Sequence, residues 1–544
     1  MCFAFLIFGL VVALFRSASF ESNDDEFINL LAAGAFGPQS QYLVHLNTAL
    51  GFVFRGLFAL IPGVNWFFWL MLVADILAVY AIIRLLTKRF LQNVPMWASF
   101  LLGVPPSLLF FRDYLFSMQY TKSGMLYSAA GLLLLYEAVF SEETETALFV
   151  AGTVFSCLGL MFRWKCFAFV LPFFLAALFF GAVGEDWRLY LKRSRILLIP
   201  ALILLALFVF DHISYESDPG WKQFREFNTL REEILDYNTP DYEAHAAEYD
   251  AAGVLPEELG MLGSWMYADP AIFTPEKLRA IRDILYRDGS HSLKFEPWVL
   301  RQIGRVFSEN AKSEPLLWFC VFFTLTALIM GSEKQKLATL VLLGILMAEL
   351  WYLICMGRPI WRAEIGAFLG TAVFSLAVAK KEKYTTPKLL ISLISILFII
   401  TFCIFQWTRS GEYRYVQLPD RMAFFEKFHE QYPENFLLGT PGAFLINNKI
   451  SNGFLTINGN WKNYFEGFTF LGGWMMPSPS GLYFAEQEGI EDPVKSIPDD
   501  SRILVAAEED ELEILEDYLR AEYHTVGNFV PVAELQGIRL WRWE

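Results

Sequence analysis

The sequence predicts an α-helical polytopic membrane protein of about 11 spans, with an exterior helical loop domain and a C-terminal exterior α/β domain. Of its 544 residues, 55% are hydrophobic and 17% are aromatic, whereas only 19% are charged. Apolar runs that approach the ~20 residues needed to cross a bilayer as a helix recur along the chain. A soluble domain of this length would not need so many such runs, so the composition excludes that class.

The candidate spans divide the chain into four parts. We expect an N-terminal membrane module (1–210), an exterior helical domain (211–314), a C-terminal membrane module (315–407) and an exterior α/β domain (408–544). The apolar runs behind this division cover residues 2–16, 66–86, 94–111, 123–140, 147–162, 166–183, 196–210, 315–331, 337–355, 363–379 and 388–407.

Basic residues indicate the orientation, because cytoplasmic loops carry an excess of Lys and Arg. With the N-terminus inside, only the acidic loop at 141–146 breaks this rule, and residues 211–314 and 408–544 lie outside a bacterial plasma membrane. Both outer regions are acidic, with 11 Lys and Arg against 20 Asp and Glu in the first and 11 against 22 in the second. They carry no basic patch that would suggest nucleic acid as a partner. The inward basic residues are Lys88, Arg89, Arg188, Lys192, Arg193, Arg195, Lys334, Lys336, Lys380, Lys381, Lys383 and Lys388.

Residues 43–61 are apolar enough to span, but a span here would invert every later loop against the charge rule. His45, Asn47 and Arg55 would also face lipid poorly. We therefore expect a helix in or near the outer interface, followed by a turn at Pro62-Gly63. For the first run, a signal peptide with a site near Ser17-Ala18-Ser19 is an alternative, and a late start that shortens the span is another.

The positions of the cysteines and histidines limit which disulfides and metal sites the chain can form. All six cysteines lie in or beside predicted spans, so the exterior domains are expected to lack disulfides, as on a Gram-positive or anaerobic bacterial surface. The six histidines show no metal-binding spacing, and we predict no histidine-built metal site. The cysteines are Cys2, Cys157, Cys166, Cys320, Cys355 and Cys403.

The two exterior regions have different patterns. Residues 211–314 are helical, with a helix start at Thr274 as cap and Pro275 as first helical residue. In the last region we expect strands at Ile503–Ala506, Tyr523–Val530 and Gly537–Trp543, with an acidic helix at Glu508–Arg520.

The acidic cluster Asn23-Asp24-Asp25-Glu26 follows the first apolar run directly. One interpretation is structural: Asn23 caps a helix, Glu26 completes a capping box, and both aspartates occupy the first turn, where the helix dipole favours acid. The other is a catalytic carboxylate held at the membrane surface. Adjacent helical residues point about 100° apart, so at most one of Asp24 and Asp25 can face a given pocket.

This arrangement resembles the GT-C class of membrane glycosyltransferases, in which the first outer loop carries the essential acidic residues. The matching elements are Asn23-Asp24-Asp25-Glu26, the interfacial stretch through His45, Asn47 and Gly51, and Trp66 at the next span. A clear second acidic motif is missing, although Asp113 could take its place. The wider pattern also resembles polytopic proteins of Firmicutes, through Arg112-Asp113, Gln119-Tyr120-Thr121-Lys122, Asn228-x-x-Arg231 and Gly357-Arg358.

The resemblance implies transfer of a sugar from a polyprenyl-phosphate donor to a cell-surface glycan or glycolipid, within membrane lipids and without a bound cofactor. The need for a divalent cation stays open. Asp24 or Asp25 would deprotonate the acceptor hydroxyl, and cations would stabilise the leaving phosphate. The candidate substrate-binding residues are Asn23, His45, Arg112, Asp113, Lys122, Arg163, Lys165, Arg358 and Arg362.

Two other function classes stay open. A transporter or flippase for a lipid-linked sugar would be expected to have internal repeats and broken helices, and Pro105-Pro106 is the strong break inside a predicted span. A non-catalytic cell-envelope assembly protein would use its exterior domains for docking and would tolerate loss of both aspartates.

Overall fold

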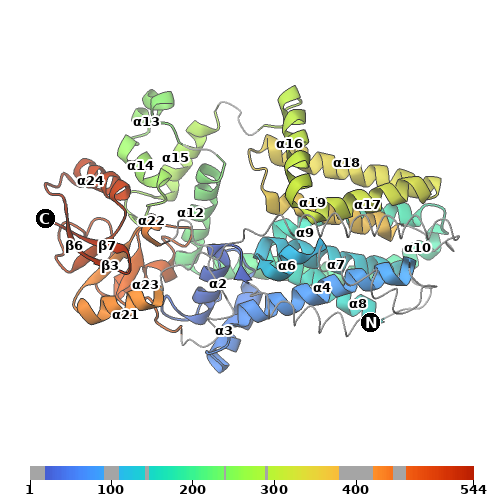
Figure 1. The fold of residues 1–544 in the computed structure, drawn as a ribbon, viewed down its shortest axis with the longest axis horizontal. Helices are drawn as coiled ribbons and strands as arrows, with labels where there is room; N and C mark the ends of the chain where they lie inside the picture. The colour runs from blue at the N-terminus through green and yellow to red at the C-terminus, as the bar shows by residue number, and fades with distance from the viewer. Residues whose placement is uncertain are drawn as a thin grey trace.

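The computed structural model describes residues 19–90, 110–140, 146–237, 240–287, 292–378, 421–444 and 461–544. Long helices form an elongated bundle, and the polar parts of the chain gather beyond one end of it (Figure 1). The predicted spans at 2–16 and 388–407 lie outside the described residues, as does nearly all of 94–111 with Pro105-Pro106.

Eight predicted spans are helices close to their predicted bounds. Among the described residues, five helices are long and apolar enough to cross a membrane, or six if one bent pair forms a single span. The polytopic membrane class is therefore confirmed, while the count of 11 stays a prediction. The eight helices are α4 (Trp66–Phe90), α7 (Tyr120–Phe140), α8 (Thr146–Phe162), α9 (Trp164–Ala182), α11 (Leu198–Glu216), α17 (Pro315–Met330), α18 (Glu333–Cys355) and α19 (Trp361–Ala377).

The bundle has a buried centre and an apolar outer face. On α7, almost every side chain is buried, and glycines let α8 approach closely: a Cβ on Gly131 would lie 2.4 Å from the Ser156 amide nitrogen. Small residues serve this purpose between membrane helices. On α11, by contrast, Leu198 and Leu202 are 62% and 65% exposed, as expected of a helix that faces lipid.

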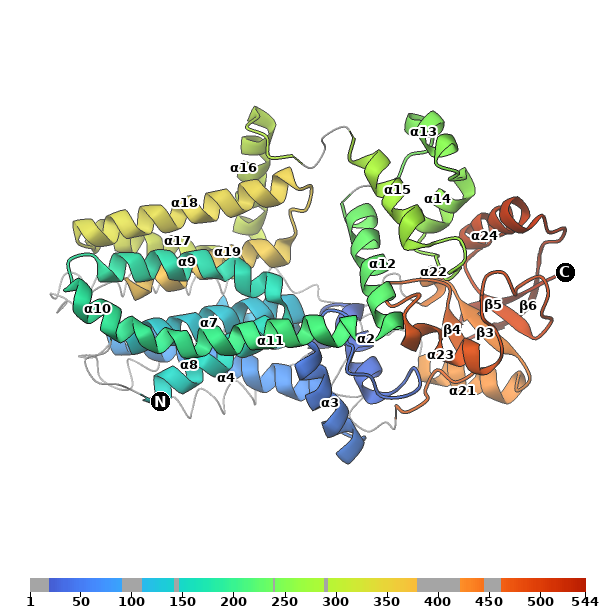
Figure 2. The same ribbon diagram turned by 180° about the vertical axis from the view of Figure 1, so that it is seen from behind.

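The two ends of the bundle differ in charge. Helix α10 (Trp187–Ser194), with Lys192 and Arg193 in its last turn, lies at the end far from the polar regions (Figure 2). At the other end, α3 (Thr48–Leu60) is a 13-residue helix, too short to cross a bilayer. Phe52 and Leu60 expose apolar surface there, while the Thr48 amide donates to Asp211 on α11 at 2.8 Å. A helix of this length does not span, and its place in the outer interface stays a prediction.

A two-stranded parallel sheet that the sequence did not predict ties the first outer loop to α7. Strand β1 (Ser19–Phe20) pairs with β2 (Ser117–Met118), which follows α6 (Arg112–Phe116). Beside this sheet, Lys122 is completely buried and forms an ion pair with Glu21. Its ammonium also donates to the carbonyl of Ser117 at 2.6 Å and lies 5.0 Å from the centre of the Trp361 ring.

Replacing Lys122 with methionine should destabilise the protein by about 1–3 kcal/mol, because the Glu21 carboxylate then keeps only Arg362, at 3.4 Å, and the Ser117 carbonyl loses its donor. Thermal unfolding in lipid should show a lower midpoint for this variant. Adding Glu21→Gln should recover part of the loss, since the amide carries no charge to compensate. An unchanged midpoint for Lys122→Met would contradict the structural role of this pair.

The exterior helices begin where α11 ends, six residues beyond the predicted boundary at 210. Thr274 caps α15 as predicted, accepting from the Lys277 amide at 3.3 Å, with Pro275 at the first helical position. Helix α16 meets α17 at an angle of 107° and stands upright against the bundle in Figure 1. The helices of this region are α12 (Pro219–Leu235), α13 (Ala246–Ala251), α14 (Pro256–Gly263), α15 (Pro275–Leu285) and α16 (Pro297–Ser313).

The last described part of the chain holds a five-stranded mixed sheet in the order β4-β3-β5-β7-β6. Strand β5 (Ile503–Ala506) has its predicted bounds, and α24 (Glu509–Tyr523) is the predicted acidic helix. The predicted strand at Tyr523–Val530 is wrong in its first six residues: the helix, held by the buried Leu515, Tyr518 and Leu519, continues to Tyr523, and the strand begins only at Phe529. The other elements are β3 (Phe436–Gly439), β4 (Phe468–Phe470), β6 (Phe529–Leu535), β7 (Ile538–Trp543), α21 (Arg421–Gln431), α22 (Pro441–Phe444) and α23 (Pro479–Gln487).

Helix α24 packs against the exterior helices through acidic side chains. Asp269, just before α15, is fully buried and accepts from the hydroxyls of Tyr518 at 2.7 Å and Tyr523 at 2.5 Å. Burial and the adjacent Asp269 raise the pKa of Asp492 to about 7. Lys495 is the nearby cation, over the Tyr523 ring at 6.0 Å.

The same interface holds a second acidic pair, so its stability should depend on pH. Burial and Glu258, which is itself paired with Lys277, raise the pKa of Glu522 to about 7. Because these folded-state pKa values lie above the ordinary ones, the stabilisation is complete at low pH and is lost as pH rises through 7. Thermal unfolding of the exterior part should therefore have a higher midpoint at about pH 5.5 than at about pH 8. Asp492→Asn should flatten this dependence; an equally steep dependence in that variant would exclude Asp492 as its source.

Candidate functional site

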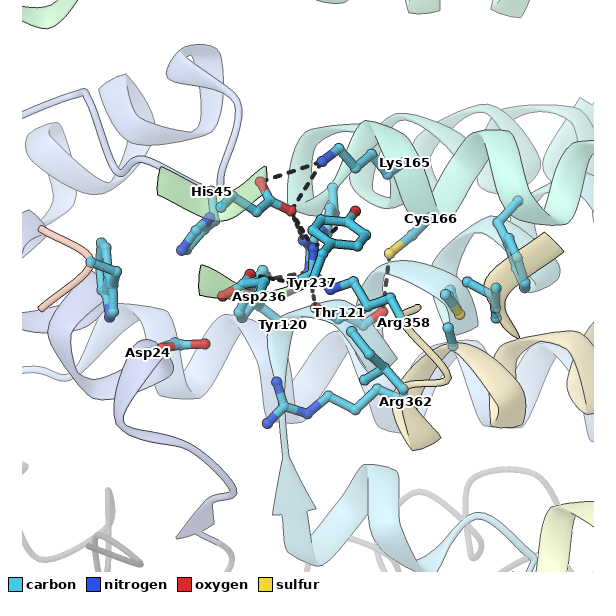
Figure 3. A pocket seen from close by; sticks show the side chains of 18 of the residues that line it. Asp24, His45, Tyr120, Thr121, Lys165, Cys166, Asp236, Tyr237, Arg358 and Arg362 are labelled. Carbon is cyan, nitrogen blue, oxygen red and sulfur yellow. Dashed lines mark hydrogen bonds and ion pairs between the residues drawn. The ribbon is translucent and has the colours of Figure 1, made fainter. Parts of the chain in front are cut away.

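A cavity of about 1090 Å³ lies where the bundle meets the exterior part of the chain. Its walls come from α2 (Asn23–Ala33), α7, α9, α12, α18 and the start of α19, together with the turns at Gly263–Trp265 and Gly473-Trp474. Residues from 24 to 474 therefore meet at one place (Figure 3).

Asp24 reaches this cavity from the first turn of α2. The helix is not capped as the structural interpretation expected: Ser22 precedes it as N-cap, Asn23 is its first residue, and Ser22 makes no side-chain cap bond. Burial raises the pKa of Asp24, against the opposing charges of Arg362, Arg163 and Arg231. A carboxylate whose pKa is raised is a stronger base than an ordinary aspartate. The side chain of Asn23 lies outside the described part of the structure.

Asp25 points away from the cavity into the protein and is 0% exposed. It accepts from the Tyr120 amide at 2.8 Å and from the Ser22 hydroxyl at 2.8 Å. Burial, followed by the charge of Asp24, raises its pKa well above the usual range. These bonds join α2 to the start of α7, so Asp25 holds the helix that carries Asp24.

Three cations converge on one carboxylate across the cavity. The Lys165 ammonium lies 3.2 Å from Glu232 Oε1, the Arg163 guanidinium lies 4.0 Å from the same oxygen, and Arg358 donates to it as well. Burial tends to raise the pKa of Glu232, but Lys165, Arg358 and Arg163 together lower it to about 2. Glu232 is therefore ionised at any working pH and holds the three cations together.

Two more arginines extend this cluster. Arg358 also donates to Asp236 at 2.6 Å, and Arg231 lies 3.8 Å from the other oxygen of Asp236. Arg362 lies beyond them, 3.4 Å from Glu21, on the same side of the cavity as Asp24 in Figure 3. Five cations thus line the cavity against four carboxylates, Asp24, Glu232, Asp236 and Glu349, and the excess of positive charge favours an anionic ligand.

His45 lies on the same side of the cavity as Asp24 and is stacked on Tyr120 (Figure 3). Its ring lies 5.3 Å from the ring of Tyr120 at an angle of 12°, and 5.0 Å from that of Trp474. Burial and then Arg163 lower its pKa to about 3, with Arg231 and Lys165 acting in the same direction. His45 is therefore a neutral imidazole at physiological pH.

The rest of the cavity wall lies between two spans and is apolar apart from Glu349 and Tyr352 on α18. On α9 it includes Phe169 and Pro172, and on α18 it includes Ile345, Ala348 and Leu353. Because both helices are long enough to cross a membrane, this part of the cavity is at the depth of the bilayer. An apolar groove that ends in a cluster of cations has the shape and polarity of a site for a lipid with an anionic head group.

The structure brings together six of the predicted site residues and separates the others. Asp24, His45, Arg163, Lys165, Arg358 and Arg362 line the cavity. Arg112 instead pairs with Asp113 at 3.3 Å and donates to the Ser313 carbonyl, and Lys122 is buried with Glu21. Their assignment to substrate binding has no geometric support, since none of the three lines the cavity.

Sequence reasoning missed Glu232 and Asp236, which organise the cations. The available signal was Asn228-x-x-Arg231, one of the patterns that carry the resemblance, with the acids Glu232 and Asp236 close after it in the sequence. As for metals, no group of three or more His, Cys, Asp or Glu side chains in the described ranges could hold an ion.

No family model matches this chain, and no curated protein matches it. Among solved structures it is similar to the crystal structures of ArnT from Cupriavidus metallidurans in the apo state and bound to undecaprenyl phosphate. Both are 11% identical in sequence and cover 99% of this chain, which in turn covers 96% and 97% of theirs. The TM-scores are 0.41 and 0.40, too low for the likeness to establish a shared fold or activity.

Proposed function

We propose that this protein is a membrane glycosyltransferase that moves a sugar from a polyprenyl-phosphate donor to a cell-surface glycan or glycolipid, with Asp24 as general base. One observation carries the proposal: a groove between α9 and α18 at bilayer depth leads into five cations, and a carboxylate faces the same cavity. The lipid tail fits the apolar part of this cavity, and the phosphate fits the cationic part.

The chemistry follows from the groups present. Asp24 takes the proton of the acceptor hydroxyl, the oxygen forms a bond to the anomeric carbon of the sugar, and the bond from that carbon to the phosphate oxygen breaks. The leaving phosphate gains one negative charge in this step. Arg163, Lys165, Arg358 and Arg362 stabilise that charge, and the leaving group then needs no proton.

The orientation completes the proposal. The basic end at α10 faces the cytoplasm according to the charge rule, so the cavity and the regions 211–314 and 408–544 face outwards from a bacterial plasma membrane. A donor embedded in the outer leaflet reaches the groove sideways from the lipid.

Transfer from a panel of polyprenyl-phosphate hexoses by the purified full chain in lipid nanodiscs tests this function. We expect sugar transfer to added envelope glycans or glycolipids from one donor of the panel, and binding of undecaprenyl phosphate to the empty protein. Absence of both activities would reject the transferase. Binding of the lipid with its movement between leaflets, and without transfer, would establish a flippase instead.

A further inference from the structure

We propose that His45, Ser264, Trp265 and Trp474 form the acceptor subsite, and that the acceptor places an uncharged sugar ring against this aromatic wall. The inference rests on the proposed function, because it assigns the second substrate of the same cavity. All four residues line the cavity.

The charges of the cavity are divided between its two sides. In Figure 3, His45 and Asp24 lie on one side, and Lys165 and Arg358 lie on the other. His45 itself is neutral, because burial and Arg163 lower its pKa to about 3. The nearby cations Arg362 and Arg231 act on Asp24 and on the Trp265 ring. The Asp24 carboxylate disfavours an anionic ligand beside it, so this wall suits a neutral one.

This wall has the chemistry that sugars require. The His45 ring is stacked on Tyr120 and tilted by 45° against Trp474, and the parts of these rings that line the cavity offer apolar surface to the C–H groups of a pyranose. The His45 imidazole makes ring contacts, and within the described part of the chain neither it nor the Ser264 hydroxyl makes a side-chain hydrogen bond. Both can therefore bond to sugar hydroxyls. A ring bound here presents a hydroxyl to Asp24.

The wall is built in advance by two segments that are far apart in sequence. The Gly473 amide donates to the Trp265 carbonyl at 3.0 Å, and Met266 pairs with Gly472 in an antiparallel bridge. Position 472 must be glycine, because a Cβ there would lie 1.5 Å from the Trp265 carbonyl oxygen.

Trp265 itself has an unfavourable backbone conformation, with φ at +60°. Such a conformation is rare for a bulky residue and persists only where the surroundings enforce it, most often at binding sites. The Arg231 guanidinium, 4.9 Å from the ring centre, fixes the orientation of the indole from one side. The contacts with Gly472 and Gly473 that enforce this conformation thus maintain the wall that would receive the ring.

Saturation-transfer NMR on the full chain in nanodiscs tests the subsite, with methyl α-glucoside, methyl α-galactoside and methyl α-mannoside as probes. Saturation of the wild-type protein should be transferred to the ring protons of at least one sugar. Trp474→Leu and His45→Ala should each weaken that binding by about three- to tenfold, the range of a lost aromatic contact. Trp187→Leu, at the far end of the bundle on α10, is the matched control and should have no effect.

Binding of undecaprenyl phosphate, measured on the same samples, separates the two proposals and reports that each variant is folded. Lipid binding without saturation of any sugar would overturn the acceptor subsite and leave the transferase intact. Equal saturation in the wild type and in both wall variants would also overturn it. If the wild type binds neither undecaprenyl phosphate nor any of the sugars, the proposed function is rejected together with this inference.

Discussion

Replacing Asp24 with asparagine should lower the turnover number for sugar transfer by about 10²–10⁴-fold, the range for loss of a general base. The amide has nearly the same size but cannot accept a proton. Donor affinity should change little, because the cations and the apolar groove are untouched. Measurement of kcat and KM with a polyprenyl-phosphate sugar, together with binding of undecaprenyl phosphate, shows whether turnover falls while donor affinity is kept.

Asp25→Asn is the matched control for this experiment. Asparagine has nearly the same size as aspartate, and burial, which raises the pKa of Asp25 well above the usual range, already disfavours a charge at this position. The amide oxygen can still accept from the Tyr120 amide. We expect this variant to fold and to keep most of its activity, whereas Asp25→Ala should loosen α2 and lose activity through misfolding. Full activity in Asp24→Asn would remove Asp24 from the mechanism.

The pH profile gives a second readout for Asp24. Burial raises its pKa above the ordinary 3.8, so the free enzyme should lose kcat/KM on the acid side at a pH above that value. The carboxylate form is the active base, and activity should rise as pH increases through its pKa. The residual activity of Asp24→Asn should not show this rise with pH.

The parts of the fold that sequence predicts well are those that one local force determines. Exclusion of polar groups from lipid determines α4 and α18, so each apolar run becomes a helix close to its predicted bounds. Likewise, the helix start at Thr274 and Pro275 depends on three or four adjacent residues, and it was found. The end of α24 depends on side chains that pack across the exterior interface, such as Tyr518, and it was missed.

The site was only partly predictable, because its charges are paired over long distances. Lys122 and Arg358 both looked like cations at the outer ends of spans. One is buried with Glu21 near β1, and the other reaches Glu232 and Asp236 from a different part of the chain. No feature of the neighbouring sequence distinguishes the buried Lys122 from the cavity-lining Arg358. In the sequence, Glu232 is one of many acids of an acidic region. Only the contact between α12 and α9 in the fold shows that it pairs with Lys165.

Arg358 and Glu232 should have opposite effects on lipid-phosphate binding. Replacing Arg358 with glutamine removes a donor to the phosphate and leaves Asp236 with Arg231 as its nearest cation. Hydrogen bonds to charged groups contribute about 1.5–3 kcal/mol, so affinity for undecaprenyl phosphate should fall by roughly 10- to 150-fold. Arg112→Gln is the matched control, because Arg112 is also a cation at the outer end of a helix but does not line the cavity.

In Glu232→Gln the same cations are released from their carboxylate. With a pKa of about 2, Glu232 is always ionised and competes with a phosphate for Lys165, Arg163 and Arg358. The amide should therefore tighten binding of undecaprenyl phosphate and make it more sensitive to salt, since more unpaired positive charge faces the ligand. Transfer should slow nevertheless, because a tightly held lipid phosphate leaves slowly as product. Weaker lipid binding in Glu232→Gln would instead mean that the carboxylate is needed to position the cations, and would count against direct competition for them.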